Sequence, residues 1–233
     1  MNNGISIGVG AHGPQTAGTS SCISAIEFSF PIMSLPEASV IRHVRKLPRH
    51  SVWRITMDDL DSEQRYITQP AWTVFINALR PGRDTLMLSL ERTSEYDAAQ
   101  LDVLCDIVEN VYPLRCFLEF EHHSWARAEQ VLRGKRIPVV QHDAPELPGI
   151  IKDIHASGKH AILRLLGRDK RHWFEHLASE RFAYRYTNAE LAVIAQRIRT
   201  LRESSDTVTA ILATHPAPSA MDNAVTLASI LSK

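Results

Sequence analysis

Residues 85–121 read TLMLSLERTSEYDAAQLDVLCDIVENVYPLRCFLEFE, and this stretch decides the fold. Its two ends, Thr85–Leu90 and Leu114–Glu121, are short apolar runs with the length and composition of strands. Between them, apolar residues recur at helical spacing, which predicts one buried helix face. These residues are Leu101, Leu104, Cys105 and Val108. A strand, a helix and a second strand in this order predict a βαβ unit with parallel strands.

The same alternation continues in both directions along the chain. The strands are predicted at Ser6–Val9, Ala25–Ser29, Ser51–Met57, Thr85–Leu90, Leu114–Glu121, Ile137–His142, Ala161–Leu166 and Val208–Ala213. Eight strands that alternate with helices favour a closed barrel over an open sheet, and 233 residues are close to the roughly 250 typical of that barrel. We therefore predict an α/β protein, a single (β/α)8 barrel of TIM type that forms one domain over residues 1–233.

Two local patterns refine this prediction. The connection between the first two strands, residues 11–24, is rich in glycine, serine and threonine, whereas a parallel crossover is usually a helix. The first helix is therefore predicted to be shortened or missing. Later in the chain, Thr187-Asn188-Ala189-Glu190 has the pattern of a capping box and predicts the start of a helix.

The composition excludes several classes of protein. The 26 basic and 26 acidic residues cancel, so no overall charge draws the chain to nucleic acid or to anionic lipid. Cys22, Cys105 and Cys116 are too few and too irregularly spaced for a disulfide framework or a cysteine zinc site. The first ten residues lack the features of a signal peptide, and no apolar run approaches the roughly 18 residues that span a bilayer. We expect a cytoplasmic protein.

Three charged residues lie within apolar strands, where an ionised group is costly unless it is paired. Glu27, Glu119 and Arg164 are therefore expected to face the barrel interior and one another. One interpretation is a structural ion cluster. The other is a catalytic site at the carboxyl ends of the strands, where a carboxylate acts as general base and Arg164 anchors an anionic group of the substrate.

Further polar residues follow the predicted strands and are candidates for binding a substrate. They are His12, His122, Asp143, Arg168 and His215. The basic stretch 168–171 could bind phosphate together with a helix that starts near Ser219, could be a solvated loop, or could contact nucleic acid. The histidines and carboxylates include zinc and manganese ligand types, but their spacing matches no metal motif. We assign no metal ligand and no cofactor, and a divalent metal is kept as a minor alternative.

Segments in order along almost the whole chain resemble the YecE-like family, also called domain of unknown function 72. The most specific is residues 118–125, LEFEHHSW, which is similar to the family's VEFRHPSW. Residues 6–10, 25–36, 143–145 and 163–168 resemble its YIGTSGW, VEINSTFYRLP, DSP and VRLHGR segments. The resemblance implies a barrel and adds Trp125 to the substrate-binding candidates. The resemblance implies no particular reaction, because the activity of the family is unassigned.

The departures from the family pattern concern polar positions. Ser29 replaces an asparagine, Met33 a tyrosine, Met57 a lysine, Ser89 a glutamine, Glu121 an arginine and Leu166 a histidine. A barrel mouth that has lost a lysine, an arginine and a histidine is less able to bind an anion. The resemblance therefore implies either an altered substrate or a loss of catalysis.

The leading hypothesis is an enzyme that acts on a small polar or anionic substrate by acid–base chemistry, with Glu27, Glu119 and Arg164 as catalytic residues. The alternative is a catalytically inert barrel that binds a ligand or a protein. Association with nucleic acid is the third hypothesis. Whether the chain is an enzyme, which reaction it performs and its oligomeric state stay open at this point.

Overall fold

The structure is a computed structural model that describes residues 4–11, 21–44, 46, 49–57, 66–151, 158–175 and 177–233. The chain divides into two compact units. Unit 1 comprises Met1–Glu27, Val140–Pro148 and Gly158–Lys233, and unit 2 comprises Phe28–Val139 and Gly149–Ser157. The single domain predicted over residues 1–233 stays a prediction.

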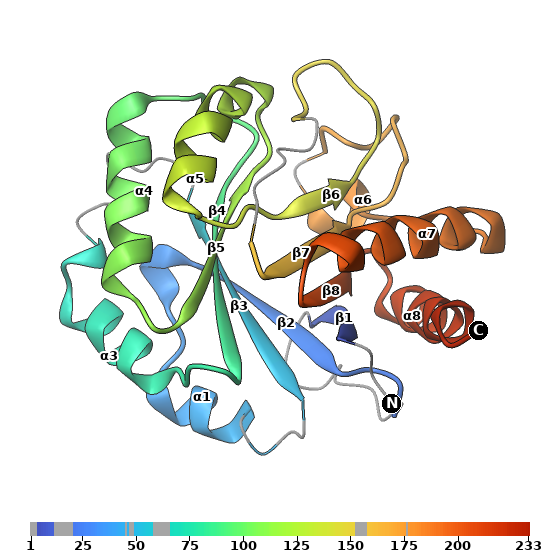
Figure 1. Ribbon diagram of the computed structural model, residues 1–233, viewed down its shortest axis with the longest axis horizontal. Helices are drawn as coiled ribbons and strands as arrows, with labels where there is room; N and C mark the ends of the chain where they lie inside the picture. Colours follow the sequence, from blue (N-terminus) through green and yellow to red (C-terminus); the bar gives the residue numbers. More distant parts are fainter. Residues whose placement is uncertain are drawn as a thin grey trace. The chain divides into compact units, whose positions relative to one another are not determined.

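Parallel strands form the centre of the fold (Figure 1). They are β1 (Ile5–Ala11), β2 (Ala25–Pro31), β3 (His50–Met57), β4 (Asp84–Leu90), β5 (Arg115–Phe120), β6 (Gln141–Asp143), β7 (His160–Leu165) and β8 (Thr207–Leu212). Their order in the sheet is β5-β4-β3-β2-β1-β8-β7-β6. Leu118 of β5 also forms a parallel bridge with Val139, which lies two residues before β6. The predicted (β/α)8 fold of TIM type is confirmed.

Helices alternate with these strands. They are the 3-10 helices η1 (Ile32–Ser34) and η2 (His123–Ala128), and the α-helices α1 (Ala38–Val44), α3 (Pro70–Ala78), α4 (Ala98–Asn110), α5 (Glu129–Lys135), α6 (Ala178–Arg181), α7 (Asn188–Ser204) and α8 (Ala217–Leu231). The Thr187 side chain accepts from the Glu190 N–H and the Glu190 side chain accepts from the Thr187 N–H, which confirms the capping box at the start of α7. No helix among the described residues is long and apolar enough to cross a bilayer.

The first crossover is only partly described. Of its residues, 21–24 are not helical, and the Ser24 hydroxyl accepts from the Ile7 N–H at 3.1 Å and so holds the end of the crossover against β1. Residues 12–20, which include the binding candidate His12, lie outside the described residues.

The prediction for β6 was wrong in its bounds. The strand spans Gln141–Asp143, whereas the apolar run predicted Ile137–His142. The earlier residues make only a local contact with β5, because Pro138 has no N–H to donate and contributes its carbonyl to the Leu118 N–H at 3.0 Å. Regular pairing with β7 begins at Gln141.

In unit 2, strand alternation decides which side chains face the helices. Trp53 of β3 is fully buried, stacks on Phe28 and makes an edge contact with Phe75 of α3. Its indole N–H donates to Asp84 at 3.1 Å. The next residue, Arg54, therefore points to the opposite face of the strand.

Unit 1 is built in the same way. Leu163 and Leu165 of β7 belong to one core with Leu191 and Ile194 of α7, and Figure 1 shows α7 and α8 side by side next to β8. Because these leucines face the helices, Arg164 between them points to the other face.

The capping box gives a test of the fold. We expect Thr187→Ala to lower the free energy of unfolding by about 0.5–2 kcal/mol, because the first turn of α7 loses the acceptor for the Glu190 N–H. Urea denaturation measures the change. The control is Ser204→Ala, which removes a hydroxyl bonded to the Leu201 carbonyl in the last turn of the same helix. An equal cost for both variants would contradict the capping role.

Candidate functional site

Glu27 and Arg164 form a closed ion pair in unit 1. The Arg164 Nε donates to Glu27 Oε2 and its Nη2 donates to Glu27 Oε1, both at 2.8 Å. Both residues are 3% exposed. Each carboxylate oxygen thus receives an N–H from a planar guanidinium, the strongest geometry that this pair of side chains offers. Two of the three predicted catalytic residues are therefore hydrogen-bonded to each other.

Glu119, the third predicted catalytic residue, is paired within unit 2. Its Oε2 accepts from the Nε of Arg54 at 2.7 Å, and Glu119 has no exposed surface. Arg54 was not singled out from the sequence. The signal was present, because Arg54 lies in the apolar run Val52-Trp53-Arg54-Ile55, where an ionised group needs a partner as much as in the strands of Glu27 and Arg164.

Arg54 joins four polar side chains, which we call the Arg54 group. Besides Glu119, its Nη2 donates to Ser89 Oγ at 2.7 Å and lies 3.7 Å from Glu121 Oε1. Its Nη1 makes the longest of these hydrogen bonds, 3.3 Å to Ser29 Oγ. The Arg54 side chain is 11% exposed, Glu121 only 3%, and Ser29 is exposed. The guanidinium is therefore buried on its Nε side and reaches solvent on its Nη1 side.

His122 lies two residues after the end of β5 and is half-buried. Its Nδ1 lies 2.8 Å from Ser124 Oγ, and that oxygen accepts from the Tyr96 N–H at 2.7 Å. Which atom of this contact donates, the ring Nδ1 or the serine Oγ, depends on the tautomer of the His122 ring. Partial burial, and then the neighbouring His123, lower the pKa of His122 from its usual 6.5.

Trp125, the candidate that came from the family resemblance, is a core residue. It has no exposed surface, its ring stacks on Phe120 at 4.4 Å, and its Nε1 donates to the Ser94 carbonyl at 2.9 Å. In this structure Trp125 packs η2 against β5 and touches no solvent.

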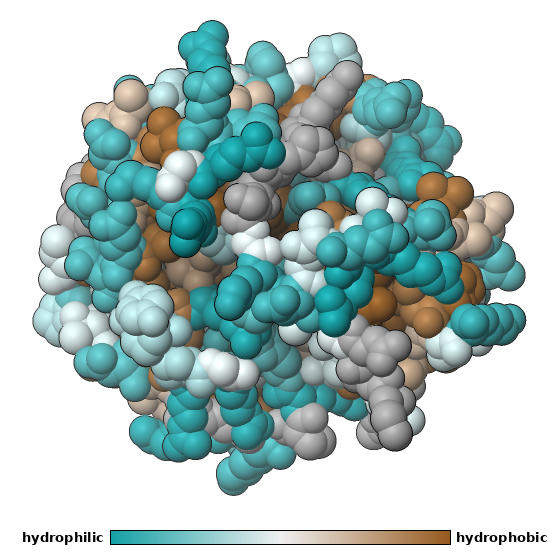
Figure 2. Space-filling view, in the orientation of Figure 1, coloured by the Kyte–Doolittle hydropathy of each residue, from teal (hydrophilic) through white to brown (hydrophobic). Residues whose placement is uncertain are grey.

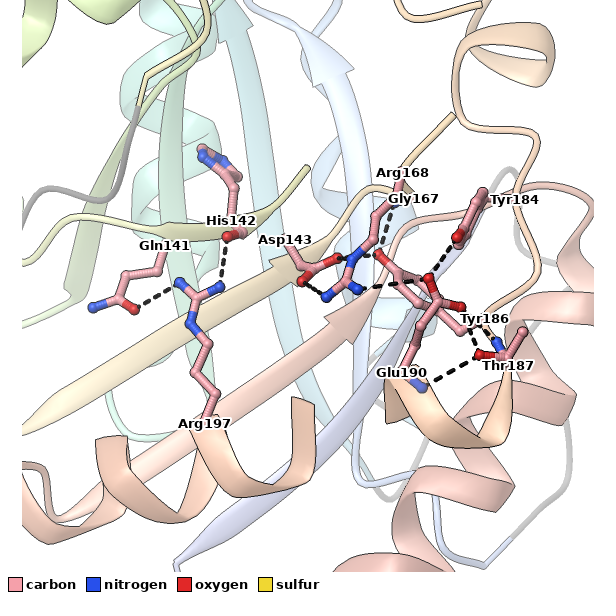
Figure 3. Close-up of polar contacts among 10 residues, drawn as sticks. All are labelled: Gln141, His142, Asp143, Gly167, Arg168, Tyr184, Tyr186, Thr187, Glu190 and Arg197. Carbon is pink, nitrogen blue, oxygen red and sulfur yellow. Dashed lines mark hydrogen bonds and ion pairs between the residues drawn. The ribbon is translucent and has the colours of Figure 1, made fainter. Parts of the chain in front are cut away.

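Asp143 and Arg168 lie together at the carboxyl ends of β6 and β7 in unit 1 (Figure 3). Arg168 donates from Nε to Asp143 Oδ1 at 2.8 Å and from Nη2 to Oδ2 at 2.6 Å. The Tyr186 hydroxyl also donates to Oδ1, at 2.9 Å, and accepts from the Gly167 N–H at 2.8 Å. These bonds to Asp143 raise the pKa of Arg168, and burial together with the charge of Asp143 raises that of Tyr186.

Glu190 extends this network at the first turn of α7. Its Oε1 accepts from the Tyr184 hydroxyl at 2.6 Å and lies 3.5 Å from Arg168 Nη1. Burial, then the hydrogen bond and charge of Glu190, raise the pKa of Tyr184 to about 12. Burial alone would raise the pKa of Glu190, but the bonds from Tyr184 and Thr187 leave it below its usual value. Asp143 and Arg168, two predicted substrate-binding residues, thus belong to a network made by the protein itself.

Arg197 of α7 holds β6 from the side of the helix. As Figure 3 shows, its guanidinium reaches Gln141 and the backbone of His142, at 3.1 Å to Gln141 Oε1 and 2.8 Å to the His142 carbonyl. The His142 side chain points away from this contact and lies beside Arg164 in the register of β6 and β7. In the sequence, His142 is the end of a predicted strand and one of the histidines of a metal-ligand type, and its place beside Arg164 follows from the register.

The predicted phosphate site after β7 and β8 has few donors. Helix α8 begins at Ala217, two residues before Ser219, and two of its first positions, Pro216 and Pro218, have no N–H. The Ser219 N–H already donates to the Pro216 carbonyl at 3.0 Å. His215, another predicted binding residue, is half-buried and exchanges backbone hydrogen bonds with Phe182 and Tyr184.

The basic stretch after β7 is partly neutralised within itself. Asp169 accepts from the backbone and side chain of Arg171 and from His172, and these bonds hold the pKa of the Asp169 carboxyl well below its usual range. Within the described ranges, no three histidine, cysteine, aspartate or glutamate side chains come together as a metal site would require.

A family model described as "Protein of unknown function DUF72" matches residues 41–233. No protein of curated function matches the chain. Two crystal structures of a DUF72 family protein from Enterococcus faecalis superpose with TM-scores of 0.79 and 0.78 at 15% identity, each over 98% of this chain and over 98% and 96% of theirs. A DUF72 family protein from Thermotoga maritima superposes with a TM-score of 0.70 at 21% identity, over 91% of this chain and 85% of its own. At this identity the structures show a shared fold.

The ion pair of unit 1 gives a quantitative test. We expect Glu27→Gln and Arg164→Met each to lower the free energy of unfolding by about 3–5 kcal/mol, because either change leaves one buried charge without this partner. The double variant Glu27→Gln/Arg164→Met should cost less than the two single costs together. Chemical denaturation of the four proteins measures the cycle.

The control is the exposed pair of Arg185 and Asp222, for which Arg185→Met should cost at most about 1 kcal/mol. If the single changes at Glu27 and Arg164 cost no more than this control, the pair does not support unit 1.

Proposed function

We propose that this chain, which belongs to the DUF72 family of proteins of unknown function, binds a small polar ligand at the Arg54 group of unit 2. The observation that carries the proposal is the Arg54 guanidinium, which is fixed on its inner side by Glu119 and Ser89 but reaches solvent beside Ser29. An incoming oxygen atom can replace the 3.3 Å contact with Ser29 while the two 2.7 Å bonds stay in place.

The position of these charges supports binding over a purely structural role. The inward layers of a TIM barrel are filled mainly by branched apolar residues, and the carboxyl ends of its strands carry the active sites of barrel enzymes. A buried ion pair adds little stability compared with apolar residues of the same size. The Arg54 group therefore has a cost in stability that ligand binding would explain.

Glu27 and Arg164 fit a supporting role better than a catalytic one. Two hydrogen bonds join the two side chains, so a substrate at either residue would have to displace a bidentate contact. Met57 and Leu166, which stand at polar positions of the family pattern, are also buried, at 0% and 1% exposure. These observations favour the ligand-binding alternative over acid–base catalysis by Glu27.

A protein partner is less well supported than a small ligand. On the face that Figure 2 shows, hydrophilic residues cover most of the coloured surface, and hydrophobic residues form small separate groups. Several of the large exposed apolar side chains lie on different helices, such as Val40 on α1, Val74 on α3 and Val193 on α7. Phe174 and Leu177 lie in the connection between β7 and α7. A docking surface for a protein would need a broader continuous apolar area.

A ligand screen tests the proposal. Thermal unfolding is measured with glucose, citrate, inorganic phosphate, glycerol 3-phosphate and free arginine, each at 10 mM. A probe at about 100 times its Kd adds about 2.7 kcal/mol of stability, a rise of several degrees in Tm. We expect at least one probe to raise Tm in this way, and Arg54→Lys to abolish the shift, because an ammonium group lacks the fork that holds Glu119 and Ser89 while offering Nη1.

The control variant is Arg185→Lys, a substitution of the same kind at a 68% exposed side chain. It should respond as the wild type does. The proposal fails if no probe stabilises the wild type, or if Arg54→Lys retains the full shift.

Acid–base catalysis on the bound ligand is the second candidate function, and one observation favours it. His122 is half-buried, follows the strand of Glu119 and has a pKa lowered by burial and by His123. A neutral imidazole at pH 7 can accept a proton from a bound molecule.

NMR titration of the His122 ring tests this candidate. We expect its pKa below 6.5, because burial disfavours the charged ring. Since the folded state then binds fewer protons than the unfolded state between the two pKa values, stability should rise with pH across that window. His122→Asn should reduce this rise. A ring that titrates at or above 6.5 would remove His122 as the base.

A further inference from the structure

The connection between β7 and α7 is the longest described excursion from the sheet in unit 1. It runs from Leu166 to Thr187, and residues 166–175 and 177–187 of it are described; we call it the strap. Its middle carries exposed apolar side chains, with Phe174 at 58% and Leu177 at 60% exposure.

The strap packs on itself. The Arg181 guanidinium lies 4.5 Å from the centre of the Trp173 ring and 4.8 Å from that of Phe182. Trp173 is 1% exposed and meets Phe182 edge-on at 5.9 Å. A loop whose ends are close and whose side chains pack together behaves as one compact body. The attachment of its ends therefore decides where the strap lies.

Both ends of the strap meet at one carboxylate, as Figure 3 shows. Asp143 accepts from Arg168 at the first end at 2.8 and 2.6 Å, and from the Tyr186 hydroxyl at the second end at 2.9 Å. The two ends also touch directly, because the Gly167 N–H donates to the Tyr186 hydroxyl at 2.8 Å. Asp143 lies on β6, outside the strap, so it links the closed loop to the sheet.

Gly167 makes this closure sterically possible. Its φ of +88° favours glycine, and a Cβ atom at this position would lie 2.5 Å from the Cβ of Tyr184. The first end can therefore turn back against the second. Backbone bonds to other parts of unit 1 are added at the second end: Tyr184 N–H to the His215 carbonyl at 3.2 Å, and Tyr186 N–H to Asn223 Oδ1 at 2.9 Å.

We infer that Asp143 is the latch of the strap: its carboxylate holds both ends of the β7–α7 connection against the carboxyl end of β6, and its loss lets the strap open as a unit while the rest of the fold stays closed. This role is independent of ligand binding at the Arg54 group. Asp143 acts here through Arg168 and Tyr186 and is a positioning residue.

Hydrogen exchange of single amides tests the latch. Asp143→Asn keeps the size of the side chain but replaces one acceptor by an NH2 group that faces the donors of Arg168. We expect the amides of Gly167, Tyr184 and Tyr186 to exchange at least tenfold faster in this variant. Amides of the fully buried strand β4 should keep the wild-type rate.

Two further variants keep the test decisive. Tyr186→Phe removes only the hydroxyl that joins Gly167 to Asp143, and we expect a smaller rise, about threefold, at Gly167. Asp169→Asn is the matched control, because Asp169 lies in the strap but its bonds reach only Arg171 and His172. It should leave the three amides unchanged.

The inference is overturned by either of two results. One is exchange in Asp143→Asn and Tyr186→Phe that is no faster than in Asp169→Asn. The other is an equal rise in the amides of β4, which would make Asp143 a support of the whole fold and not of the strap. If Asp143→Asn does not fold, the result for Tyr186→Phe decides alone.

Discussion

An ionised side chain on the inner face of a strand must find its counter-charge within a few ångströms, because burial removes most of the water that would otherwise solvate it. The structure meets this constraint with arginine each time. Arg164 holds Glu27 in unit 1 and Arg54 holds Glu119 in unit 2, at 2.7–2.8 Å. A lysine carries three donors on a rotating ammonium group, whereas the guanidinium holds its donors in a rigid planar fork that matches a carboxylate. The fork thus sets the distances on which each polar group depends.

The two arginines differ in what they leave available. Arg164 gives the N–H groups of Nε and Nη2 to one carboxylate and is 3% exposed, so the pair is part of the buried core. Arg54 spreads its fork over carboxylates and hydroxyls and keeps 11% of its side chain exposed. The same residue type therefore supports the structure in one unit and, in our proposal, recognition in the other.

The network around Asp143 is a third arrangement of polar residues in this structure. Its members, Arg168, Tyr184, Tyr186 and Glu190, are joined to Asp143 and to one another by hydrogen bonds and an ion pair. Residues of this kind resemble a binding site in sequence, because they are polar and follow strands. Their work in the structure is to join a long connection to the sheet. In our proposal, the contacts with a bound molecule are therefore made by the Arg54 group and His122, and the network around Asp143 holds the strap.

Within unit 2, the departures from the family pattern cluster at the Arg54 group. Ser29, Ser89 and Glu121 all contact Arg54, and all three differ from the residues of the family segments that they resemble. Shorter hydroxyls and a carboxylate change both the room and the donors around the guanidinium. The chain is therefore expected to recognise a ligand different from that of relatives that keep the longer residues.

The sequence by itself determined the class of fold. The period of apolar residues distinguishes strand from helix locally, and eight alternations leave few topologies. It also identified Glu27, Glu119 and Arg164 as charges that need partners, and the capping box of α7. Only the tertiary structure decided which partners they take: Glu119 pairs with Arg54, 65 residues away in the chain, and Arg164 with Glu27, 137 residues away. The bounds of β6 and the contacts of Asp143 could likewise not be predicted from the sequence. They depend on hydrogen bonds between distant segments, which are set by strand register and loop closure. The local spacing of residues carries no information on either.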